Sequence, residues 1–250
     1  GDGGTSANYD TTVTVSAVND APTFSVGDGK ATTSFGSGWE FGKETILQPD
    51  GKILVAGYSD SSGSDDFSLA RYNVDGTLDT SFGGGDGIVL AGIVGRAETA
   101  VLQADGKIVL SGYTTNGGYQ VCLVRFNTNG TLDTSFGGGD GIASSGVYGS
   151  AKDIGLQTDG KFLVAADLSN NNFNLMRFNS DGSLDTSFGG GPGYVSTDFA
   201  GGSDRADSLT IQSDGKVLLA GFGFNGTSFD FALVRYNTDG SLDTSFNGTG

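Results

Sequence analysis

The chain has 250 residues, of which 45 are glycine and only 3 are proline, and it carries a formal net charge of −16 with no histidine. So many glycines disfavour long helices, because each costs about 1 kcal/mol in a helix relative to alanine, and their lack of a period of three excludes collagen. The negative charge argues against nucleic acid and anionic membrane surfaces as partners, since both are bound through clustered lysine and arginine.

Residues 1–24 differ from the rest of the chain and are predicted to end a preceding β domain. Thr11–Val18 alternates polar and apolar residues, as a half-buried strand does, and Asn19-Asp20-Ala21-Pro22 then ends it. A single strand cannot fold alone, so we expect the chain, which begins at Gly1, to be part of a longer polypeptide. The stretch resembles the closing strand and linker of cadherin-like tandem repeats in giant bacterial surface proteins. By that resemblance, Asn19 and Asp20 are candidate calcium ligands.

Residues 25–250 are predicted to form a single repeat domain. A Gln-x-Asp-Gly-Lys motif begins each copy at Gln48, Gln103, Gln157 and Gln212, so the copies start 55, 54 and 55 residues apart. Each copy ends in Leu-Asp-Thr-Ser-Phe, at Phe82, Phe136, Phe188 and Phe246. A unit of such constant length, about 54 residues, indicates stacked supersecondary units.

Each copy is predicted to contain four strands. The first ends at the Gln, as in Thr45-Ile46-Leu47, and an x-Asp-Gly-Lys hairpin turn follows it. The second is an apolar run such as Ile53–Ala56, and after a loop of variable length the third carries Phe67 and Leu69 on one face and Ala70 and Tyr72 on the other. An Asp-Gly or Asn-Gly turn then leads to Leu-Asp-Thr-Ser-Phe as the fourth strand and to a glycine-rich connection.

Strands that are apolar on both faces need a neighbouring sheet on each side. A single sandwich would leave polar alternation on its outer faces, and a β-solenoid suits repeats of about 20–30 residues. The predicted fold class is therefore all-β, a β-propeller-like array of four-stranded antiparallel blades in four copies. We interpret Thr33-Ser34-Phe35 as a degenerate copy of Thr80-Ser81-Phe82. On this interpretation the array runs from one fourth strand to another.

Eight of the thirteen cations recur once per copy, as Lys52, Lys107, Lys161, Lys216, Arg71, Arg125, Arg177 and Arg235. An arginine on an apolar strand face needs a partner, because an unpaired buried charge is costly, and the repeated aspartate across the hairpin is the nearest candidate. We therefore interpret the hallmarks as structural: Asp50, Gly51, Lys52, Arg71, Asp79, Phe82, Asp105, Gly106, Lys107, Arg125, Asp133, Phe136, Asp159, Gly160, Lys161, Arg177, Asp185, Phe188, Asp214, Gly215, Lys216, Arg235, Asp243 and Phe246.

The same hallmarks resemble the delta-60 repeat family, over about residues 35–250. The resemblance implies propeller blades in large secreted or surface-attached bacterial proteins, and the family has no assigned catalytic residues. The third copy departs from the pattern, with Gly155 and Asp167 at otherwise apolar or small positions and Pro192 where Asp86 and Asp140 stand in the first two.

Other chemistry is weakly indicated. Without histidine and with the single Cys122, predicted to be a small core or interface residue, the chain lacks histidine triads, common zinc sites and disulfides. Asn73–Asp79 places oxygen side chains as calcium loops do, and Gly83–Ile88 is similar to a calcium-binding nonapeptide, but the glycine position and the long period favour turns. Asp65 and Asp66 are predicted to be solvated in a variable loop.

We therefore expect a non-enzymatic structural or ligand-binding module of a large, adhesin-like bacterial protein, located outside the cell. No apolar run reaches the roughly 18 residues of a membrane helix, so no membrane insertion is expected. The expected partners are further repeats and domains of the same polypeptide and a glycan or protein at the cell surface. We expect no cofactor, with calcium as the one candidate. The alternative is a carboxylate-dependent glycan-active enzyme on a propeller scaffold, which would need a convergent, unrepeated acidic pair.

Overall fold

The computed structural model describes residues 29–60 and 63–248, and this part of the chain is built from antiparallel β-strands. The strands are β1 (Glu40–Leu47), β2 (Ile53–Ser59), β3 (Asp66–Tyr72), β4 (Ile88–Leu102), β5 (Ile108–Thr114), β6 (Gln120–Phe126), β7 (Ile142–Leu156), β8 (Phe162–Leu168), β9 (Phe173–Phe178), β10 (Tyr194–Thr197), β11 (Arg205–Ile211), β12 (Val217–Phe224) and β13 (Phe229–Tyr236). One short 3₁₀ turn, η1 (Phe188–Gly190), interrupts them. The predicted all-β class is confirmed.

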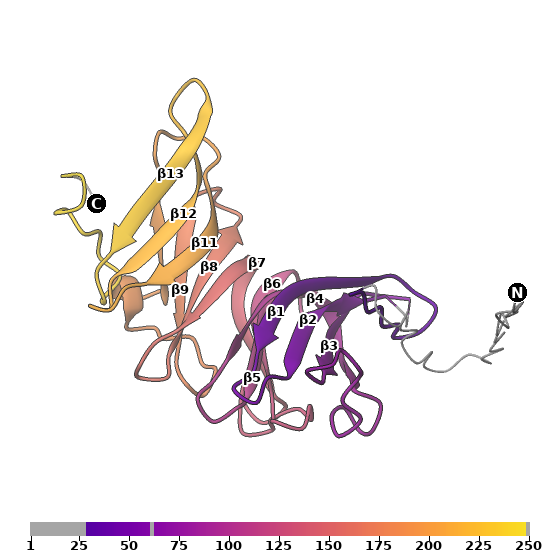
Figure 1. Cartoon of the computed structure of the whole chain (residues 1–250). Helices are drawn as coiled ribbons and strands as arrows, with labels where there is room; N and C mark the ends of the chain where they lie inside the picture. The colour runs from indigo at the N-terminus through magenta and orange to yellow at the C-terminus, as the bar shows by residue number, and fades with distance from the viewer. Residues whose placement is uncertain (1–28, 61–62, 249–250) are drawn as a thin grey trace, which may run out of the picture.

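The strands form four blades that follow one another along an open arc (Figure 1). Blade 1 contains β1, β2, β3 and residues 88–94 of β4, and blade 2 contains residues 95–102 of β4, β5, β6 and the first half of β7. Blade 3 contains the second half of β7 with β8, β9 and β10, and blade 4 contains β11, β12 and β13. The array is propeller-like, but the four blades do not close into a ring.

Two strands serve two blades each. β4 pairs with β3 through residues 88–94 and with β5 through residues 95–102, and it reverses direction in between. Gly92 and Gly95 have positive φ values of 72° and 156° at this bend, a conformation that is costly for residues with a side chain. Gly146 and Gly149 repeat it in β7, so one continuous segment links each of these blades to the next.

The first three strands of each blade lie where the sequence predicts them, but the predicted fourth strand is wrong. In blade 1, Leu78 forms only an isolated bridge with Tyr72. The Asp79 carboxylate then accepts hydrogen bonds from the N–H and hydroxyl of Ser81, at 3.0 and 2.7 Å, which folds Leu-Asp-Thr-Ser-Phe into a turn. The true fourth strand follows the glycine-rich connection and begins at Ile88.

The predicted phase of the first copy is also wrong. The Thr33 hydroxyl is hydrogen-bonded to the Tyr72 hydroxyl, as Thr197 of β10 is to Tyr236 of blade 4. The Phe35 N–H donates to the Glu40 carboxylate, and the same bond joins residues 199 and 204. Residues 30–35 therefore correspond to β10 and the loop after it, not to Thr80-Ser81-Phe82, and the described part of blade 4 has three strands.

The core lies between blades, as the two apolar faces of each strand predict. We call the face of a blade toward the preceding blade its front face and the opposite one its rear face. Leu54, Phe67 and Leu69 on the rear of blade 1 are fully buried against the front of blade 2, where Cys122 is also buried. Two further clusters join blades 2 and 3 and blades 3 and 4.

The departures of the third copy have local causes. A Cβ at Gly155 would lie 2.7 Å from Leu209 and 2.9 Å from Ile211, so this glycine makes room for side chains of blade 4. Asp167 lies 3.8 Å from Lys152 across β7 and β8. Pro192 stands where Asp86 and Asp140 accept a hydrogen bond from the N–H two residues on, and there the connection forms η1 instead.

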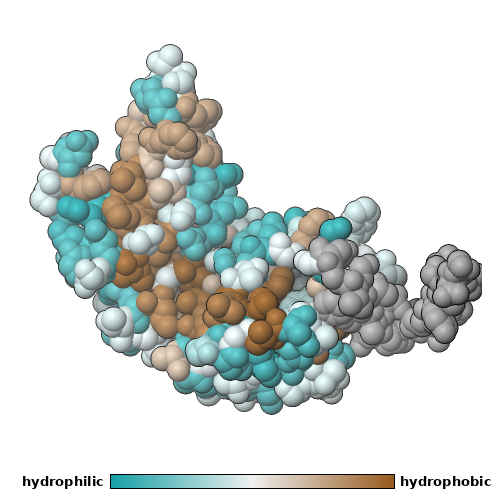
Figure 2. Space-filling model, viewed as in Figure 1, coloured by the Kyte–Doolittle hydropathy of each residue, from teal (hydrophilic) through white to brown (hydrophobic). Residues whose placement is uncertain are grey.

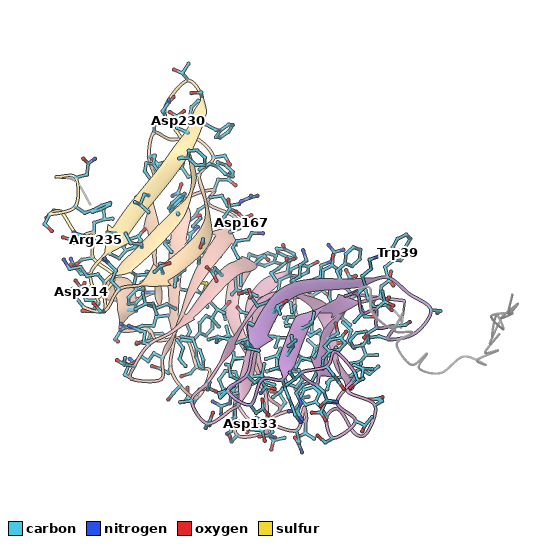
Figure 3. All side chains as sticks on the ribbon, in the orientation of Figure 1. Trp39, Asp133, Asp167, Asp214, Asp230 and Arg235 are labelled. Carbon is cyan, nitrogen blue, oxygen red and sulfur yellow. The ribbon has the colours of Figure 1, made fainter. Side chains whose placement is uncertain are left out.

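The blade ends differ in character. One end carries the hairpin turns and the Leu-Asp-Thr-Ser-Phe segments, and we call it the turn end; the other carries the variable loops, and we call it the loop end. Asp133 lies at the turn end, whereas Trp39 and Asp230 lie at the loop end (Figure 3). Within the described residues, no helix is long and apolar enough to cross a membrane.

Candidate functional site

A cluster of charges recurs at the turn end of every blade. In blade 2 the Asp133 carboxylate accepts hydrogen bonds from Arg125 Nε at 2.7 Å and Lys107 Nζ at 2.8 Å, and from the Ser135 N–H and hydroxyl at 3.0 and 2.7 Å. The same contacts surround Asp79, Asp185 and Asp243. The arginine–aspartate pair is the one that the sequence predicts, and the structure adds the lysine. We call this arrangement the clamp.

The clamp also ties each blade to the next. Arg125 Nη1 donates to the Ser180 carbonyl in the second hairpin turn of blade 3, at 2.9 Å, and Arg71 and Arg177 make the same bond to Thr128 and Thr238. The Arg125 guanidinium lies 4.3 Å above the Phe136 ring, a favourable cation–π distance. The repeated phenylalanine is thereby fixed in the interface between blades, where Phe82, Phe136 and Phe188 are at most 1% exposed.

The clamp aspartates are held ionised by their partners. Burial opposes ionisation of Asp133, but hydrogen bonds from Lys107 and Ser135 and the charge of Arg125 outweigh it and keep the pKa of the carboxyl below its usual range. The pKa values of Asp79, Asp185 and Asp243 are lowered by the same kinds of partner. A carboxylate with four donors and a lowered pKa has little capacity left to accept a proton, so the clamp suits structure better than catalysis.

The other repeated residues form turns. Asp50, Asp105, Asp159 and Asp214 each accept a hydrogen bond from the lysine N–H two residues on, at 3.1 Å. The glycines between them, Gly51, Gly106, Gly160 and Gly215, have φ values of 82° to 84°. The Asp75 carboxylate likewise accepts hydrogen bonds from the N–H and hydroxyl of Thr77 within its own turn. Asn73–Asp79 is therefore a turn, as the sequence analysis interprets it.

Asp65 and Asp66 have structural roles at the loop end of blade 1, and the prediction that they are solvated is wrong for Asp66. Its carboxylate is buried and accepts hydrogen bonds from Gly92 and Ile93 at 2.9 and 2.8 Å, so it holds the bend of β4. Burial raises the pKa of Asp66 and the backbone hydrogen bonds oppose that change. Asp65 pairs with Arg96 at 2.7 Å.

Aromatic side chains gather at the loop end, among them the exposed Phe41 and Tyr119 and the buried Tyr58. Phe41 stacks on Tyr58 with ring centroids 4.8 Å apart, and Arg96 lies 4.7 Å over the same Tyr58 ring. Tyr113 and Tyr119 are 4.4 Å apart in blade 2. Tyr58 and Tyr113 stand at the same position, ten residues after the repeated Gln; Phe222 holds this position in blade 4 and Asp167 holds it in blade 3.

The most ligand-like of these arrangements lies between blades 2 and 3. A pocket of about 250 Å³ is lined by Tyr119, Tyr148, Gly149, Asp167, Leu168, Ser169 and Asn171. Tyr119 and Tyr148 are 43% and 60% exposed, which leaves ring surface for a ligand. We call it the tyrosine pocket. Sequence reasoning missed it, although Tyr119 is an aromatic residue that follows two glycines in a variable loop.

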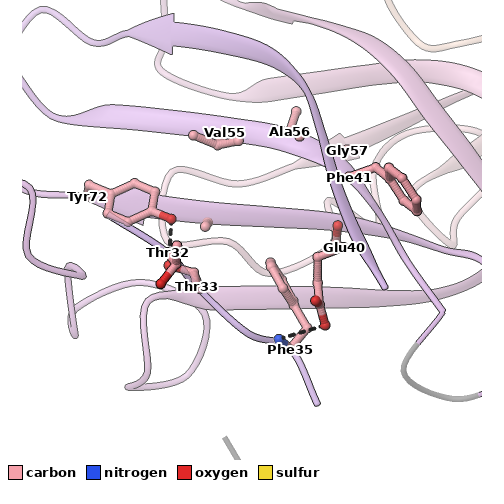
Figure 4. Close-up of a pocket in the computed structure, with 12 residues that line it drawn as sticks. Thr32, Thr33, Phe35, Glu40, Phe41, Val55, Ala56, Gly57 and Tyr72 are labelled. Atoms are coloured by element: carbon pink, nitrogen blue, oxygen red, sulfur yellow. Dashed lines mark hydrogen bonds between the residues drawn. The ribbon is translucent and has the colours of Figure 1, made fainter. Parts of the chain in front are cut away.

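A larger pocket, of about 370 Å³, lies on the front face of blade 1. Thr32, Thr33 and Phe35 form one wall, and Val55, Gly57 and Tyr72 are among the residues opposite (Figure 4). Its polar links are the hydrogen bonds Thr33–Tyr72 and Phe35–Glu40. This wall corresponds to the contact of β10 with blade 4, so the pocket is an incompletely filled interface between blades.

Metal-binding groups are sparse in the part of the chain that the structure describes. No group of three or more acidic, histidine or cysteine side chains is placed to hold a metal ion within residues 29–60 and 63–248. The candidate calcium ligands Asn19 and Asp20, with the whole predicted domain of residues 1–24, lie outside the described residues.

Comparison with known families gives one match, to a family described as a domain of unknown function (DUF5122) with a β-propeller fold, at residues 48–82, 103–136, 157–188 and 212–246. These four segments run from the repeated Gln to the repeated Phe and cover more than half of the chain. No curated protein matches the chain.

Among solved structures, the chain is similar to a protein of unknown function from Dyadobacter fermentans, with 14% identity and a TM-score of 0.49 over 81% of this chain and 54% of the other. A putative oxidoreductase (glucose dehydrogenase) from Thermus thermophilus has 14% identity and a TM-score of 0.46, over 78% and 62% of the two chains. A putative glycosidase from Bacteroides thetaiotaomicron has 12% identity and a TM-score of 0.45, over 82% and 72%. The chain thus spans less than two thirds of the first two.

Proposed function

The chain belongs to the DUF5122 β-propeller family, and we propose that it is a non-enzymatic binding module of the delta-60 type within a large secreted or cell-surface bacterial protein. In this proposal the repeated residues build the scaffold, and a glycan binds in the tyrosine pocket. The whole protein is adhesin-like and continues into further repeats and cadherin-like domains. The proposal includes no resident cofactor, and Asn19 and Asp20 are its candidate calcium ligands.

The observation that carries the proposal is the chemistry of the tyrosine pocket. Two exposed tyrosine rings offer flat apolar faces of the kind on which the C–H face of a sugar ring packs, and aromatic residues give much contact area at little cost in side-chain entropy. Asp167, Ser169 and Asn171 line the same pocket and supply acceptors and donors for hydroxyl groups. Such a mixture of flat apolar and short polar groups selects a neutral, hydroxyl-rich ligand.

The acidic surface supports the same ligand class. A net charge of −16 repels polyanions, which disfavours acidic polysaccharides and nucleic acid relative to neutral glycans. A net charge of this size also favours solubility.

Hydrolysis of the glycan is the second candidate function, because Asp167 is a carboxylate in the pocket lining. Glycoside hydrolysis ordinarily uses two carboxyl groups about 5–10 Å apart, flanking the scissile bond. The carboxylate among the lining residues is that of Asp167, which also lies 3.8 Å from Lys152. Binding is therefore the better-supported function.

Glycan-array screening followed by titration calorimetry tests the proposal. Neutral oligosaccharides are expected to bind, and Tyr148→Ala is expected to weaken binding by about 1–3 kcal/mol if the ring is an anchor in the contact. Trp39→Ala is the matched control, since Trp39 is 73% exposed at the loop end of blade 1 and outside the pocket. Binding that Tyr148→Ala leaves intact, or that Trp39→Ala abolishes, would refute the assigned site.

The enzymatic alternative is tested with the same ligands. Incubation of the chain with each bound oligosaccharide is expected to leave the ligand intact by mass spectrometry. Cleavage that is lost in Asp167→Asn, with binding retained, would establish the hydrolase and overturn the non-enzymatic proposal.

A further inference from the structure

Asparagine followed by glycine occurs four times in the chain, as Asn116-Gly117, Asn129-Gly130, Asn225-Gly226 and Asn247-Gly248. In such a pair the backbone nitrogen of the glycine can attack the asparagine Cγ, because glycine has no Cβ to hinder the approach and its backbone turns freely. A folded protein slows the attack when it holds the asparagine amide in hydrogen bonds or engages the glycine N–H. The first three pairs can be compared on both counts, whereas the fourth adjoins residues outside the described part of the chain.

Asn116 is held on neither count. It is exposed in the loop between β5 and β6, where its backbone N–H donates to the Thr114 hydroxyl at 3.1 Å, but among the described residues its side-chain amide has no hydrogen-bond partner. The loop is a β-turn in which the Gly118 N–H donates to the Thr115 carbonyl at 3.1 Å, and Gly117, with a φ of 82°, holds its third position. The N–H of the third residue takes no part in the bond that closes such a turn, and the described residues give the Gly117 N–H no acceptor.

Asn129 is held on both counts. Its Oδ1 accepts hydrogen bonds from the N–H and the hydroxyl of Thr131, at 3.1 and 2.8 Å. The Gly130 N–H donates to the Asn127 carbonyl at 2.9 Å, so the nitrogen that would attack is engaged as well. This pair is therefore expected to react slowly in the folded chain.

Asn225 shows that exposure alone does not decide the outcome. The loop that joins β12 to β13 forms the hydrophilic tip of blade 4 (Figure 2), and Asn225 is exposed there. Its Oδ1 nevertheless accepts hydrogen bonds from two backbone N–H groups, at 2.8 and 2.9 Å, and its Nδ2 donates to the Asp230 carboxylate. The amide cannot rotate toward the Gly226 nitrogen without breaking these bonds.

The loop that carries Asn116 also supports the tyrosine pocket. Tyr119 lines the pocket, and its carbonyl accepts a hydrogen bond from the N–H of Gly149, another lining residue, at 3.2 Å. A Cβ on Gly118 would lie 2.9 Å from the Tyr148 hydroxyl, so the backbone of the loop passes close to the second ring. A change in backbone length at Asn116 therefore displaces groups that contact both tyrosines.

We propose that Asn116 is a site of spontaneous deamidation and that this reaction alters the tyrosine pocket. The Gly117 nitrogen forms a bond to Asn116 Cγ, the Cγ–Nδ2 bond breaks, and the Gly117 proton leaves with Nδ2 as ammonia. Water then adds to either carbonyl of the resulting succinimide ring and opens it. One product is aspartate, and the other is isoaspartate, in which the main chain runs through Cβ and Cγ. Water is the co-reactant, and no atom is oxidised or reduced.

The two products have different consequences for the pocket. Both add a negative charge, but Asn116 is exposed and is not among the lining residues, so solvent and salt screen that charge. Isoaspartate also lengthens the backbone by one atom and shifts Gly118 relative to Tyr148. If the pocket binds a glycan, as the proposed function has it, isoaspartate formation lowers the affinity severalfold, whereas aspartate leaves it nearly unchanged.

Peptide mapping by mass spectrometry tests the reaction without any ligand, on the full 250-residue chain incubated at mildly alkaline pH. The peptide with Asn116 is expected to convert severalfold faster than those with Asn129 and Asn225, and to yield both products. In denaturant the three pairs should convert at similar rates, because the hydrogen bonds that distinguish them are lost. Conversion of Asn116 that is no faster than that of the other two in the folded chain, or rates that still differ in denaturant, would overturn the proposal.

The effect on the pocket is measured on aged and fresh protein, with Asn116→Gln as the matched variant, because its longer side chain closes the ring far more slowly. Hydrogen exchange of the Gly149 N–H reports on the pocket without a ligand and is expected to be faster in the aged wild type, but not in aged Asn116→Gln. Equal exchange in aged and fresh wild type would overturn the link to the pocket.

Titration with the neutral oligosaccharide that gives the strongest array signal separates this inference from the proposed function. Aged wild type is expected to bind severalfold more weakly than fresh wild type, whereas fresh Asn116→Asp, which has the charge but a backbone of normal length, should bind as the wild type does. Weak binding by fresh Asn116→Asp would refute the role of backbone length. Fresh wild type that binds no glycan would refute the proposed function, while the deamidation and the exchange of Gly149 would still be decided by the measurements above.

Discussion

Asp133→Ala should be one of the most destabilising single changes in the chain. Asp133 is 5% exposed, and its carboxylate accepts four hydrogen bonds, two of them from cations. Its removal leaves the Arg125 side chain, only 9% exposed, without its counterion in the interface between blades. Breaking a buried ion pair from one side costs about 3–5 kcal/mol. Lys107 is 29% exposed and regains water, which places the expected loss near the lower bound, at about 3 kcal/mol.

Thermal unfolding followed by far-ultraviolet circular dichroism measures this loss. For a chain of this size, about 3 kcal/mol corresponds to a fall of about 6–12 °C in Tm. Asp243→Ala is the matched control, because Asp243 has the same partners in blade 4 but its arginine is more exposed and, within the described residues, has no carbonyl beyond it. Its Tm should fall clearly less, since the stranded arginine can be solvated.

Two results would contradict the reasoning. Equal falls in Tm for Asp133→Ala and Asp243→Ala would show that burial in the interface does not set the cost. No fall for Asp133→Ala would show that Arg125 finds another counterion. Replacing the three charged residues together, as Lys107→Met, Arg125→Met and Asp133→Leu, should recover much of the loss, because no charge is then left buried.

Four further predictions follow from the structure. The clamp carboxyls have pKa values below the unfolded value of about 3.9, so the stability they contribute should be present above that pH and be lost as the pH falls toward their folded pKa. Unfolding of the chain above about pH 5, in a pH titration followed by circular dichroism, would contradict this. Gly155→Val should cost about 1–3 kcal/mol by overpacking against Leu209 and Ile211, and an unchanged Tm would argue against that contact. Cys122 is fully buried and burial raises its pKa to about 12, so it should react with a thiol reagent such as DTNB only after unfolding; rapid reaction of the native chain would place it at the surface. EDTA should leave the Tm of the blades unchanged, because their repeated carboxylates bind lysine, arginine and backbone N–H groups, whereas a Tm that rises with millimolar calcium would reveal a metal site.

The strands that could be predicted from the sequence are those whose pattern depends on burial alone. Ile53–Ala56 and Phe67–Tyr72 are apolar on both faces, and only stacking of sheets on both sides accounts for that. The fourth strand is mispredicted because Leu-Asp-Thr-Ser-Phe looks extended and is repeated. Its aspartate accepts hydrogen bonds from the serine two residues on, and this local contact overrides the apparent strand.

The candidate sites show the same contrast. The pairing of Arg71 with Asp79 could be predicted, because a charge on an apolar strand requires a partner nearby. The tyrosine pocket could not, since Tyr148 and Asp167 come from different blades and are brought together only by how β7 bends at Gly149. Features that recur in each copy can thus be predicted from the sequence, whereas features that occur once depend on the path of the loops.

The strands β4 and β7 give the array a mechanical property. Because each runs from the outside of one blade to the inside of the next, tension along the polypeptide passes from blade 1 to blade 2 and from blade 2 to blade 3 through an extended segment without an intervening loop. A blade that yields releases about 54 residues, or roughly 180 Å of contour at about 3.4 Å per residue, before load passes to its neighbour. When the chain is pulled from its two ends, its length should therefore increase in discrete and nearly equal steps, one for each blade that unfolds.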